Sequence, residues 1–230
     1  MADGMKPILK VQHVAKSFGK GNKEIQVLQN VNLAINESSL TALKGRSGSG
    51  KTTLLNLIGT LDKPSEGKIY FQDNEISQYS EKQSSELRRL NFGIIFQSYG
   101  LIPLLTVAEN IEFGLRITDV PRKEWKKRIE ESIDLVGLTK RVKHRPYELS
   151  GGEQQRVAIA RAIAPKPSLI LADEPTAELD SYMAFRMIQV FQELTQNDKI
   201  TILMTTHDPG ILEMLDDVYA LEAGKLADDY

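Results

Sequence analysis

One glycine-rich stretch combines residue types that can hold phosphate. The sequence GRSGSGKTT at residues 45–53 follows a short apolar run and precedes a helical pattern. Its glycines let consecutive backbone N–H groups curl around phosphate oxygens, and a helix beginning near Gly50 adds roughly half a positive charge at its N-terminus. Lys51 supplies a point charge for the outer phosphates, and the Thr52 hydroxyl can ligate Mg²⁺. The pattern therefore predicts a nucleotide-phosphate loop made by Gly45, Arg46, Ser47, Gly48, Ser49, Gly50, Lys51, Thr52 and Thr53.

A pair of acids follows another apolar run. Asp173 and Glu174 end the segment SLILADE. An acid at the carboxyl end of a parallel strand lies where α/β sheets bind ligands, so Asp173 is predicted to hold Mg²⁺, directly or through water. Glu174 points differently and could orient or deprotonate an attacking water. Two acids in a solvated turn are the alternative, which the neighbouring phosphate loop disfavours. His207 also follows an apolar run, and only this placement separates it from an ordinary structural histidine.

A second glycine-rich stretch, LSGGE at residues 149–153, has the features of a helix start. Ser150 followed three residues later by Glu153 predicts a capping box. Gly151 and Gly152 leave the first helical N–H groups open to close approach, so this segment is also predicted to bind an anion. Two anion sites on one chain could serve two ligands or grip one ligand from both sides, and the residues alone leave both readings open.

The elements that must position these residues follow from hydrophobic periodicity. Short, largely apolar runs bounded by breakers are typical of buried parallel strands, and they occur at residues 40–44, 168–172 and 200–204. Helical patterns separate them, and residues 98–165 read as mostly helical. The sequence therefore predicts an α/β core that carries a helical insertion.

The N-terminal third shows a different pattern. Residues 8–18 alternate weakly, and Val31, Leu33 and Ile35 share one face at period two. Residues 68–76 predict a hairpin that turns at Asp73 and Asn74. These segments together predict an antiparallel sheet.

Composition limits the functional classes. The 230 residues carry a net charge of −2, which gives no argument for nucleic acid as a partner. The sequence has 0 cysteines, so disulfides, thiolate metal sites and cysteine nucleophiles are excluded. No apolar run approaches the ~20 residues that span a bilayer, and the N-terminus lacks the apolar region of a signal peptide. We therefore expect a cytoplasmic protein.

Taken together, the three motifs resemble Walker A, signature and Walker B of ABC-type ATPases, in that family's order and over essentially the whole chain. The resemblance implies an α/β fold of the P-loop NTPase (RecA-like) class, with an antiparallel β subdomain and a helical signature subdomain. Residues 1–230 would form a single nucleotide-binding domain, with the helical subdomain at about 98–165. The implied ligands are ATP and Mg²⁺. In the family, two copies pair head to tail, so LSGGE would grip the nucleotide of a second copy.

Further positions resemble family residues one at a time. Gln97 resembles the Q-loop glutamine, which senses Mg²⁺ and links the insertion to the core. Asp180 resembles the D-loop aspartate that crosses the dimer interface, and His207 resembles the switch histidine at the γ-phosphate. Phe18 resembles the aromatic residue that stacks on adenine, with Val27 beside it. The implied catalytic residues are Glu174, His207 and Gln97, and the implied metal ligands are Thr52, Gln97 and Asp173.

Three departures from the family pattern stand out. Glu153 replaces a common glutamine but keeps the cap. Ala177 and Glu178 stand where Gly-Asn or Gly-Ala is usual, which could alter coupling between the two sites. Asn36 replaces a glycine that commonly turns the chain, and asparagine tolerates the left-handed conformation such a turn needs. None of these touches the P-loop lysine or the Walker B acids, so active hydrolysis is predicted.

The segment at residues 87–111 is similar to an exporter-like subgroup. It includes macrolide-export and lipoprotein-release ATPases and antimicrobial-peptide resistance systems. This implies an integral membrane permease subunit that contacts residues 98–110, and a location on the inner face of the cell membrane.

The alternatives are a soluble ABC ATPase acting on nucleic acid or ribosomes, and a cell-division ABC ATPase. A small-molecule kinase would leave LSGGE and Gln97 without a purpose. No residue identifies the transported or released substrate.

Overall fold

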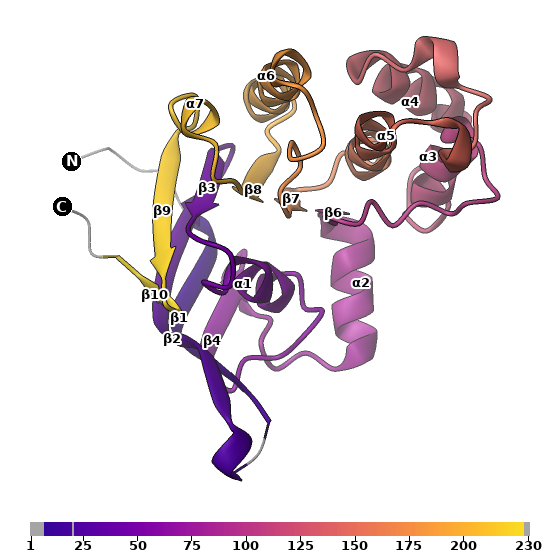
Figure 1. The fold of residues 1–230 in the computed structure, drawn as a ribbon. Coiled ribbons are helices and arrows are strands. Elements are labelled where there is room, and N and C mark those ends of the chain that lie inside the picture. Colours follow the sequence, from indigo (N-terminus) through magenta and orange to yellow (C-terminus); the bar gives the residue numbers. More distant parts are fainter. Residues whose placement is uncertain (1–6, 20, 228–230) are drawn as a thin grey trace.

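The computed structural model describes residues 7–19 and 21–227 and contains two sheets (Figure 1). The first sheet is antiparallel and has the order β2-β1-β4-β5. Its strands are β1 (Pro7–Phe18), β2 (Ile25–Asn36), β4 (Glu66–Phe71) and β5 (Asn74–Glu75), with a 3₁₀ turn η1 (Gly21–Lys23) between the first two. Val31, Leu33 and Ile35 all face the core of this sheet, which confirms their predicted alternation.

The second sheet has the order β10-β9-β3-β8-β7-β6. Its strands are β3 (Leu40–Lys44), β6 (Phe92–Ile95), β7 (Leu169–Ala172), β8 (Thr201–Thr205), β9 (Asp217–Glu222) and β10 (Lys225–Leu226). All pairs are parallel except that of β9 with β10. The three predicted apolar strands are β3, β7 and β8, and they lie at the centre of this sheet. The pairing of β3 with β8 joins segments that are more than a hundred and fifty residues apart in the sequence.

Helices cover both faces of the parallel sheet. α5 (Gly151–Ile163), α6 (Ser181–Asn197) and α7 (Pro209–Leu212) lie on one side, and α1 (Lys51–Ile58) lies on the other, toward the antiparallel sheet (Figure 1). α2 (Glu81–Asn91) leads directly into β6. Between β6 and β7 the chain forms α3 (Val107–Arg116), α4 (Arg122–Leu135), two 3₁₀ turns, η2 (Thr139–Arg141) and η3 (Pro146–Glu148), and then α5. This helical stretch matches the predicted insertion.

Two apolar cores hold these layers together. One joins the two sheets around α1, with Leu28, Leu43 and Leu57 all buried. The other lies under α5 and α6 and continues into α3, so that Ile111 and Ile170 belong to the same cluster. The insertion therefore shares its core with the parallel sheet, and the boundaries of a separate subdomain at 98–165 stay a prediction.

The hairpin turn lies one residue earlier than predicted. Gln72 and Asp73 occupy it with φ of 48° and 63°, while Asn74 already belongs to β5. Two consecutive left-handed residues are the geometry of a type I′ turn, whose twist matches that of the flanking strands.

The left-handed residue after β2 is also different from the predicted one. Asn36 pairs with Pro7 in the β1–β2 ladder and is therefore extended. Ser38 takes the positive φ, 57°, and its N–H donates to Thr201 Oγ1 at 3.0 Å. The turn survives without the family's glycine because the chain bends two residues later.

Candidate nucleotide-binding and catalytic site

Four parallel strands deliver the predicted site residues to one edge of the sheet. β3 ends at the glycine loop and β6 just before Gln97, while β7 ends just before Asp173 and β8 shortly before His207. The carboxyl ends of parallel strands form the crevice where α/β sheets bind ligands. A cleft there is lined by residues 44–53, 220–223, Val27, Gln97, Glu174, His207 and Leu212. All nine predicted residues of the glycine loop therefore face one cleft.

Two glycines of the loop cannot be replaced without strain. A Cβ on Gly45, which has φ 156°, would lie 2.2 Å from the carbonyl oxygen of Leu221. Gly50 precedes α1 with φ 105°, and a Cβ there would lie 2.7 Å from Leu28 Cδ2. The loop is thus held in a shape that leaves its N–H groups at the start of α1.

Lys51 is held at the centre of this loop. Its side chain is buried, and Nζ donates to the carbonyl oxygens of Gly45 at 2.8 Å and Arg46 at 3.2 Å. Ser49 Oγ is buried with no hydrogen-bond partner among the residues described. A buried cation beside an unpaired hydroxyl and free helical N–H groups fits a polyphosphate.

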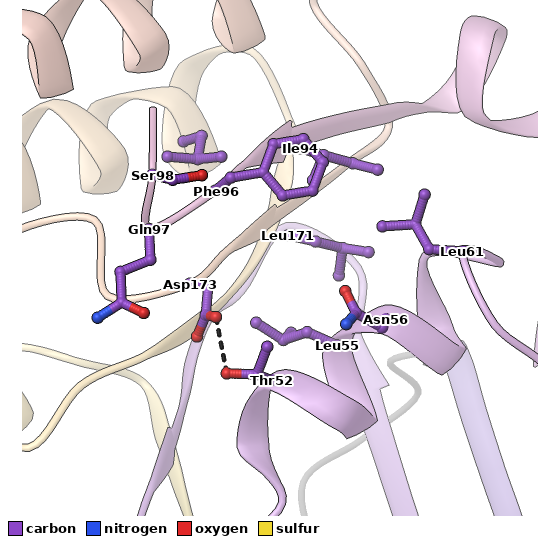
Figure 2. A pocket seen from close by; sticks show the side chains of 11 residues that line it. Thr52, Leu55, Asn56, Leu61, Ile94, Phe96, Gln97, Ser98, Leu171 and Asp173 are labelled. Atoms are coloured by element: carbon purple, nitrogen blue, oxygen red, sulfur yellow. Dashed lines mark hydrogen bonds between the residues drawn. The ribbon is translucent and has the colours of Figure 1, made fainter. Parts of the chain in front are cut away.

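A chain of hydrogen bonds joins the P-loop to the acids. Thr52 Oγ1 donates to Asp173 Oδ2 at 2.7 Å, which Figure 2 shows. Thr205 Oγ1 donates to Asp173 Oδ1 at 2.8 Å and accepts from the N–H of Glu174, also at 2.8 Å. Thr205 is fully buried, and it belongs to none of the motifs that predict the site. Its only sequence signal is a hydroxyl at the end of an apolar strand.

Glu174 lies close to the two other predicted catalytic residues, Gln97 and His207. Gln97 Nε2 donates to Glu174 Oε2 at 3.3 Å, and His207 Nδ1 lies 3.8 Å from Glu174 Oε1. Glu174 itself has φ 48°, a left-handed conformation that is rare outside glycine and asparagine. Such strain persists only where the surrounding contacts hold it, and here Thr205 fixes the Glu174 N–H.

The oxygen donors of the predicted metal site lie together. Thr52, Gln97 and Asp173 line one groove beside α1 (Figure 2). In the part of the chain that the structure describes, no group of three or more His, Cys, Asp and Glu side chains could hold a metal. A hydroxyl, an amide oxygen and one carboxylate fit Mg²⁺, which takes few protein ligands and completes its shell with water and phosphate.

The predicted capping box at the start of α5 is confirmed. Glu153 N–H donates to Ser150 Oγ at 3.2 Å, and Ser150 N–H donates to Glu153 Oε2 at 3.0 Å. A Cβ on Gly151 would lie 3.2 Å from Tyr99 Oη, and one on Gly152 would lie 2.9 Å from the carbonyl oxygen of Glu178. The two glycines thus admit neighbours of the same chain, and the binding of an anion here stays a prediction. None of residues 150–153 lines the cleft at the P-loop.

The remaining predicted residues lie in different places. Val27 lines the cleft, whereas Phe18 is 45% exposed at the end of β1 and lies outside the described lining. Lys16 Nζ lies 4.8 Å from the Phe18 ring centroid. Asp180 accepts from the N–H of Met183 at 3.0 Å and so caps α6. The stacking role of Phe18 and the interface role of Asp180 stay predictions.

One wall of the cleft was not found from the sequence. Residues 220–223, at the end of β9, line it beside the P-loop. Gly224 in the following turn donates its N–H to the carbonyl of Ser49 at 3.2 Å and accepts from the N–H of Gln29 at 2.8 Å. Only the tertiary pairing of β3 with β9 brings this turn to the site, so local sequence carries no signal for it.

The parallel sheet, the glycine loop and the acids at the strand ends define a P-loop nucleotide-binding protein. The ABC transporter family profile matches residues 28–177, and the chain belongs to that family. It is an ATP-binding, ATP-hydrolysing subunit of this family.

Individual relatives agree over nearly the full chain. The lipoprotein-releasing system ATP-binding protein LolD of Hahella chejuensis is 42% identical, with 96% of each chain covered. The ABC transporter ATP-binding protein YtrE of Bacillus subtilis is 40% identical, covering 95% of this chain and 96% of its own. The ATP-binding cassette MJ0796, solved as a dimer in a post-hydrolysis state with ADP and Pi, superposes with a TM-score of 0.91 at 37% identity over 96% of this chain and 97% of its own. No helix within the described ranges is both long and apolar enough to cross a membrane.

Proposed function

We propose that two copies of this chain close head to tail around ATP and that closure drives a separate membrane subunit. One observation carries the proposal. The start of α5 is built as an anion site, with a capped Ser150 and two glycines, yet it lies outside the cleft that the P-loop of the same chain lines. A second copy, turned head to tail, would bring its nucleotide to that site. The dimer of MJ0796 supports this arrangement.

Within one copy, the P-loop and Lys51 bind the phosphates of ATP, and Val27 and Phe18 contact the base. Thr52, Asp173 and Gln97 would hold Mg²⁺, which neutralises the charge that develops on the transferred phosphate. Because Thr52 and Asp173 already share a hydrogen bond of 2.7 Å, their oxygen atoms are close enough to serve one ion.

Glu174 is the general base in this proposal. It would take the proton of the attacking water, while Gln97 and His207 hold its two oxygens and meet the γ-phosphate side of the cleft. Fixing the backbone of Glu174 through Thr205 keeps that carboxylate aimed without reorganisation during the reaction.

The membrane subunit would contact residues 98–110. Leu104 in this segment is 79% exposed. Ser98, the first residue of the segment, lines the groove of Figure 2, whose apolar lining includes Leu61, Ile94 and Phe96. Exposed apolar residues around a groove favour a protein partner.

The chain would then lie in the cytoplasm on the inner face of the membrane. The LolD relative favours export, extraction or mechanotransmission of a lipoprotein, peptide or drug. Nucleic acid is not expected, because the net charge is −2.

The test uses the Glu174→Gln variant. Removing the base should lower ATP turnover by about 10²–10⁴-fold while leaving ATP binding intact, so that the closed dimer accumulates. With ATP, this protein should dimerise in solution and should retain its membrane subunit when gently solubilised native membranes are passed over it. Mass spectrometry of the retained material should identify a membrane protein with few spans and a large outer domain.

Lys51→Ala is the matched control, because it removes the phosphate-binding cation and should abolish both dimer and retention. Turnover by Glu174→Gln at the wild-type rate would contradict the base assignment. Recovery of only ribosomes, nucleic acid or soluble protein would contradict the membrane role and favour the soluble class.

A further inference from the structure

A carboxylate occupies the start of the α5 anion site. Glu153 lies in the first turn of the helix, where the N–H groups face outward from the capped end. A neutral glutamine at this position could make the same cap, because its side-chain oxygen can also accept from Ser150 N–H. Capping of α5 therefore does not require the negative charge of Glu153.

This charge is fully developed in the folded chain. Arg141 and Ser150 both donate to Glu153, and the Arg141 hydrogen bond, followed by that of the Ser150 backbone, holds the Glu153 pKa below its ordinary value. A carboxylate at the helix end would repel the phosphate of an incoming nucleotide, because like charges in a partly desolvated site oppose each other.

Arg141 supplies the opposite charge from outside the helix. It ends η2, and its Nε donates to Glu153 Oε1 at 2.8 Å, while Ser150 N–H occupies Oε2 at 3.0 Å. The Glu153 side chain is 18% exposed and the Arg141 side chain 45% exposed, so the pair lies at the surface, beside the helix start that a second copy would cover in the proposed dimer. The two donors leave each carboxylate oxygen of Glu153 with its own partner.

We propose that Arg141 neutralises Glu153, and that this ion pair takes the place of a neutral glutamine so that the start of α5 can accept the nucleotide phosphate of a second copy. Arg141 is a positioning residue and does not itself react. The inference rests on the proposed head-to-tail dimer.

The experiment measures ATP-dependent dimerisation in the Glu174→Gln background by analytical ultracentrifugation. Arg141→Gln leaves the Glu153 charge uncompensated, so the ATP concentration at half-maximal dimer should rise about five- to tenfold. Adding Glu153→Gln to that variant should restore the reference value, whereas Glu153→Gln alone leaves the Arg141 cation unpaired and should place the ATP concentration at or below the reference value. Arg141→Lys, which keeps the charge, should lie close to the reference and provides a second variant if Arg141→Gln does not fold.

The dependence on salt concentration distinguishes neutralisation of the Glu153 charge from a purely structural contact between η2 and α5. Raising ionic strength from about 0.1 M to about 1 M shortens the screening length from about 10 Å to about 3 Å. The difference between Arg141→Gln and the reference should therefore shrink with salt. Arg116→Gln, which breaks the exposed pair of Arg116 with Glu112, is the control and should match the reference at both salt levels.

A defect of Arg141→Gln that persists in the double variant, or that does not shrink with salt, would overturn this inference while leaving the dimer in place. Equal dimerisation of Arg141→Gln and the reference would do the same. A reference protein that forms no dimer with ATP would instead overturn the proposed function, and this inference with it.

Discussion

Thr205 shows how one hydroxyl can set the geometry of two acids. It donates to the carboxylate of Asp173 and accepts from the backbone of Glu174, so its proton and its lone pair serve two neighbouring residues just after β7. Because Glu174 has φ 48°, its conformation costs on the order of 1–3 kcal/mol, which the hydrogen bond to Thr205 helps to offset.

Replacing Thr205 with Val keeps the shape of the side chain and removes both hydrogen bonds. We expect a loss of about 1–3 kcal/mol in the free energy of unfolding, because a buried N–H is left unpaired. The value of kcat for ATP should fall about tenfold or more with little change in KM, because the acids act in the reaction more than in binding. Steady-state kinetics and urea unfolding check both values.

The conservative variant Thr205→Ser distinguishes positioning from packing. It restores the hydroxyl and loses only the methyl group, so it should recover most of kcat. If Val at position 205 supports the wild-type kcat, Thr205 does not position the acids.

At the scale of elements, the two glycines at the start of α5 contact different kinds of neighbouring atoms. Gly151 faces the tip of the Tyr99 side chain and the carboxylate of Glu178, which are flexible ends of side chains. Gly152 faces the backbone carbonyl of Glu178, which cannot move without its segment. Neither glycine has a positive φ, so sterics alone decide what a methyl group costs at each position.

These two glycines make a matched pair of variants. Alanine at position 151 should leave the free energy of unfolding within about 0.5 kcal/mol of the wild type, because a small steric cost is offset by better helix propensity. Alanine at position 152 should destabilise by about 1–3 kcal/mol, because the backbone at Glu178 must shift. Thermal unfolding of the two variants measures the difference, and equal melting temperatures would contradict the steric argument.

Contiguous sequence predicts some elements of this fold and not others. The P-loop, the Walker B acids and the α5 cap were predictable because each motif combines its residues within a few positions. β6 was not, because α2 ends at Asn91 and the strand begins at the next residue, with no turn signal between them. The roles of Thr205 and Arg141 need contacts 32 and 12 residues apart in sequence, which spacing alone does not reveal.

At the scale of the whole molecule, one arginine ties α5 to the loop that carries Gln97. Arg161 Nη2 donates to the Tyr99 carbonyl at 2.8 Å, and Nη1 donates to the Gly100 carbonyl. Tyr99 and Gly100 both have positive φ, so the loop takes a shape that these bonds hold. A rotation of α5 would therefore move the loop, and with it the glutamine that contacts Glu174.

Replacing Arg161 with Met should release that loop. We expect faster amide hydrogen exchange in residues 98–105 and a loss of about 1–3 kcal/mol in the free energy of unfolding. Arg128→Met is the control, because Arg128 donates to the carbonyls of Ala164 and Pro165, at the same C-terminal end of α5, and to Glu124, all outside residues 98–105. Unchanged exchange in residues 98–105 would mean that Arg161 does not hold the loop.

The strand order also bears on how the chain is made. Among the strands that the structure describes, β3, which leads into the P-loop, pairs with β8 and β9 alone, and both follow it by more than a hundred and fifty residues. On the ribosome, the P-loop motif emerges early, but its strand has no partner in the sheet until residues 201–222 have been synthesised. The nascent chain therefore carries the phosphate-binding sequence long before it can present a finished nucleotide cleft, because residues 220–223 at the end of β9 form part of the lining.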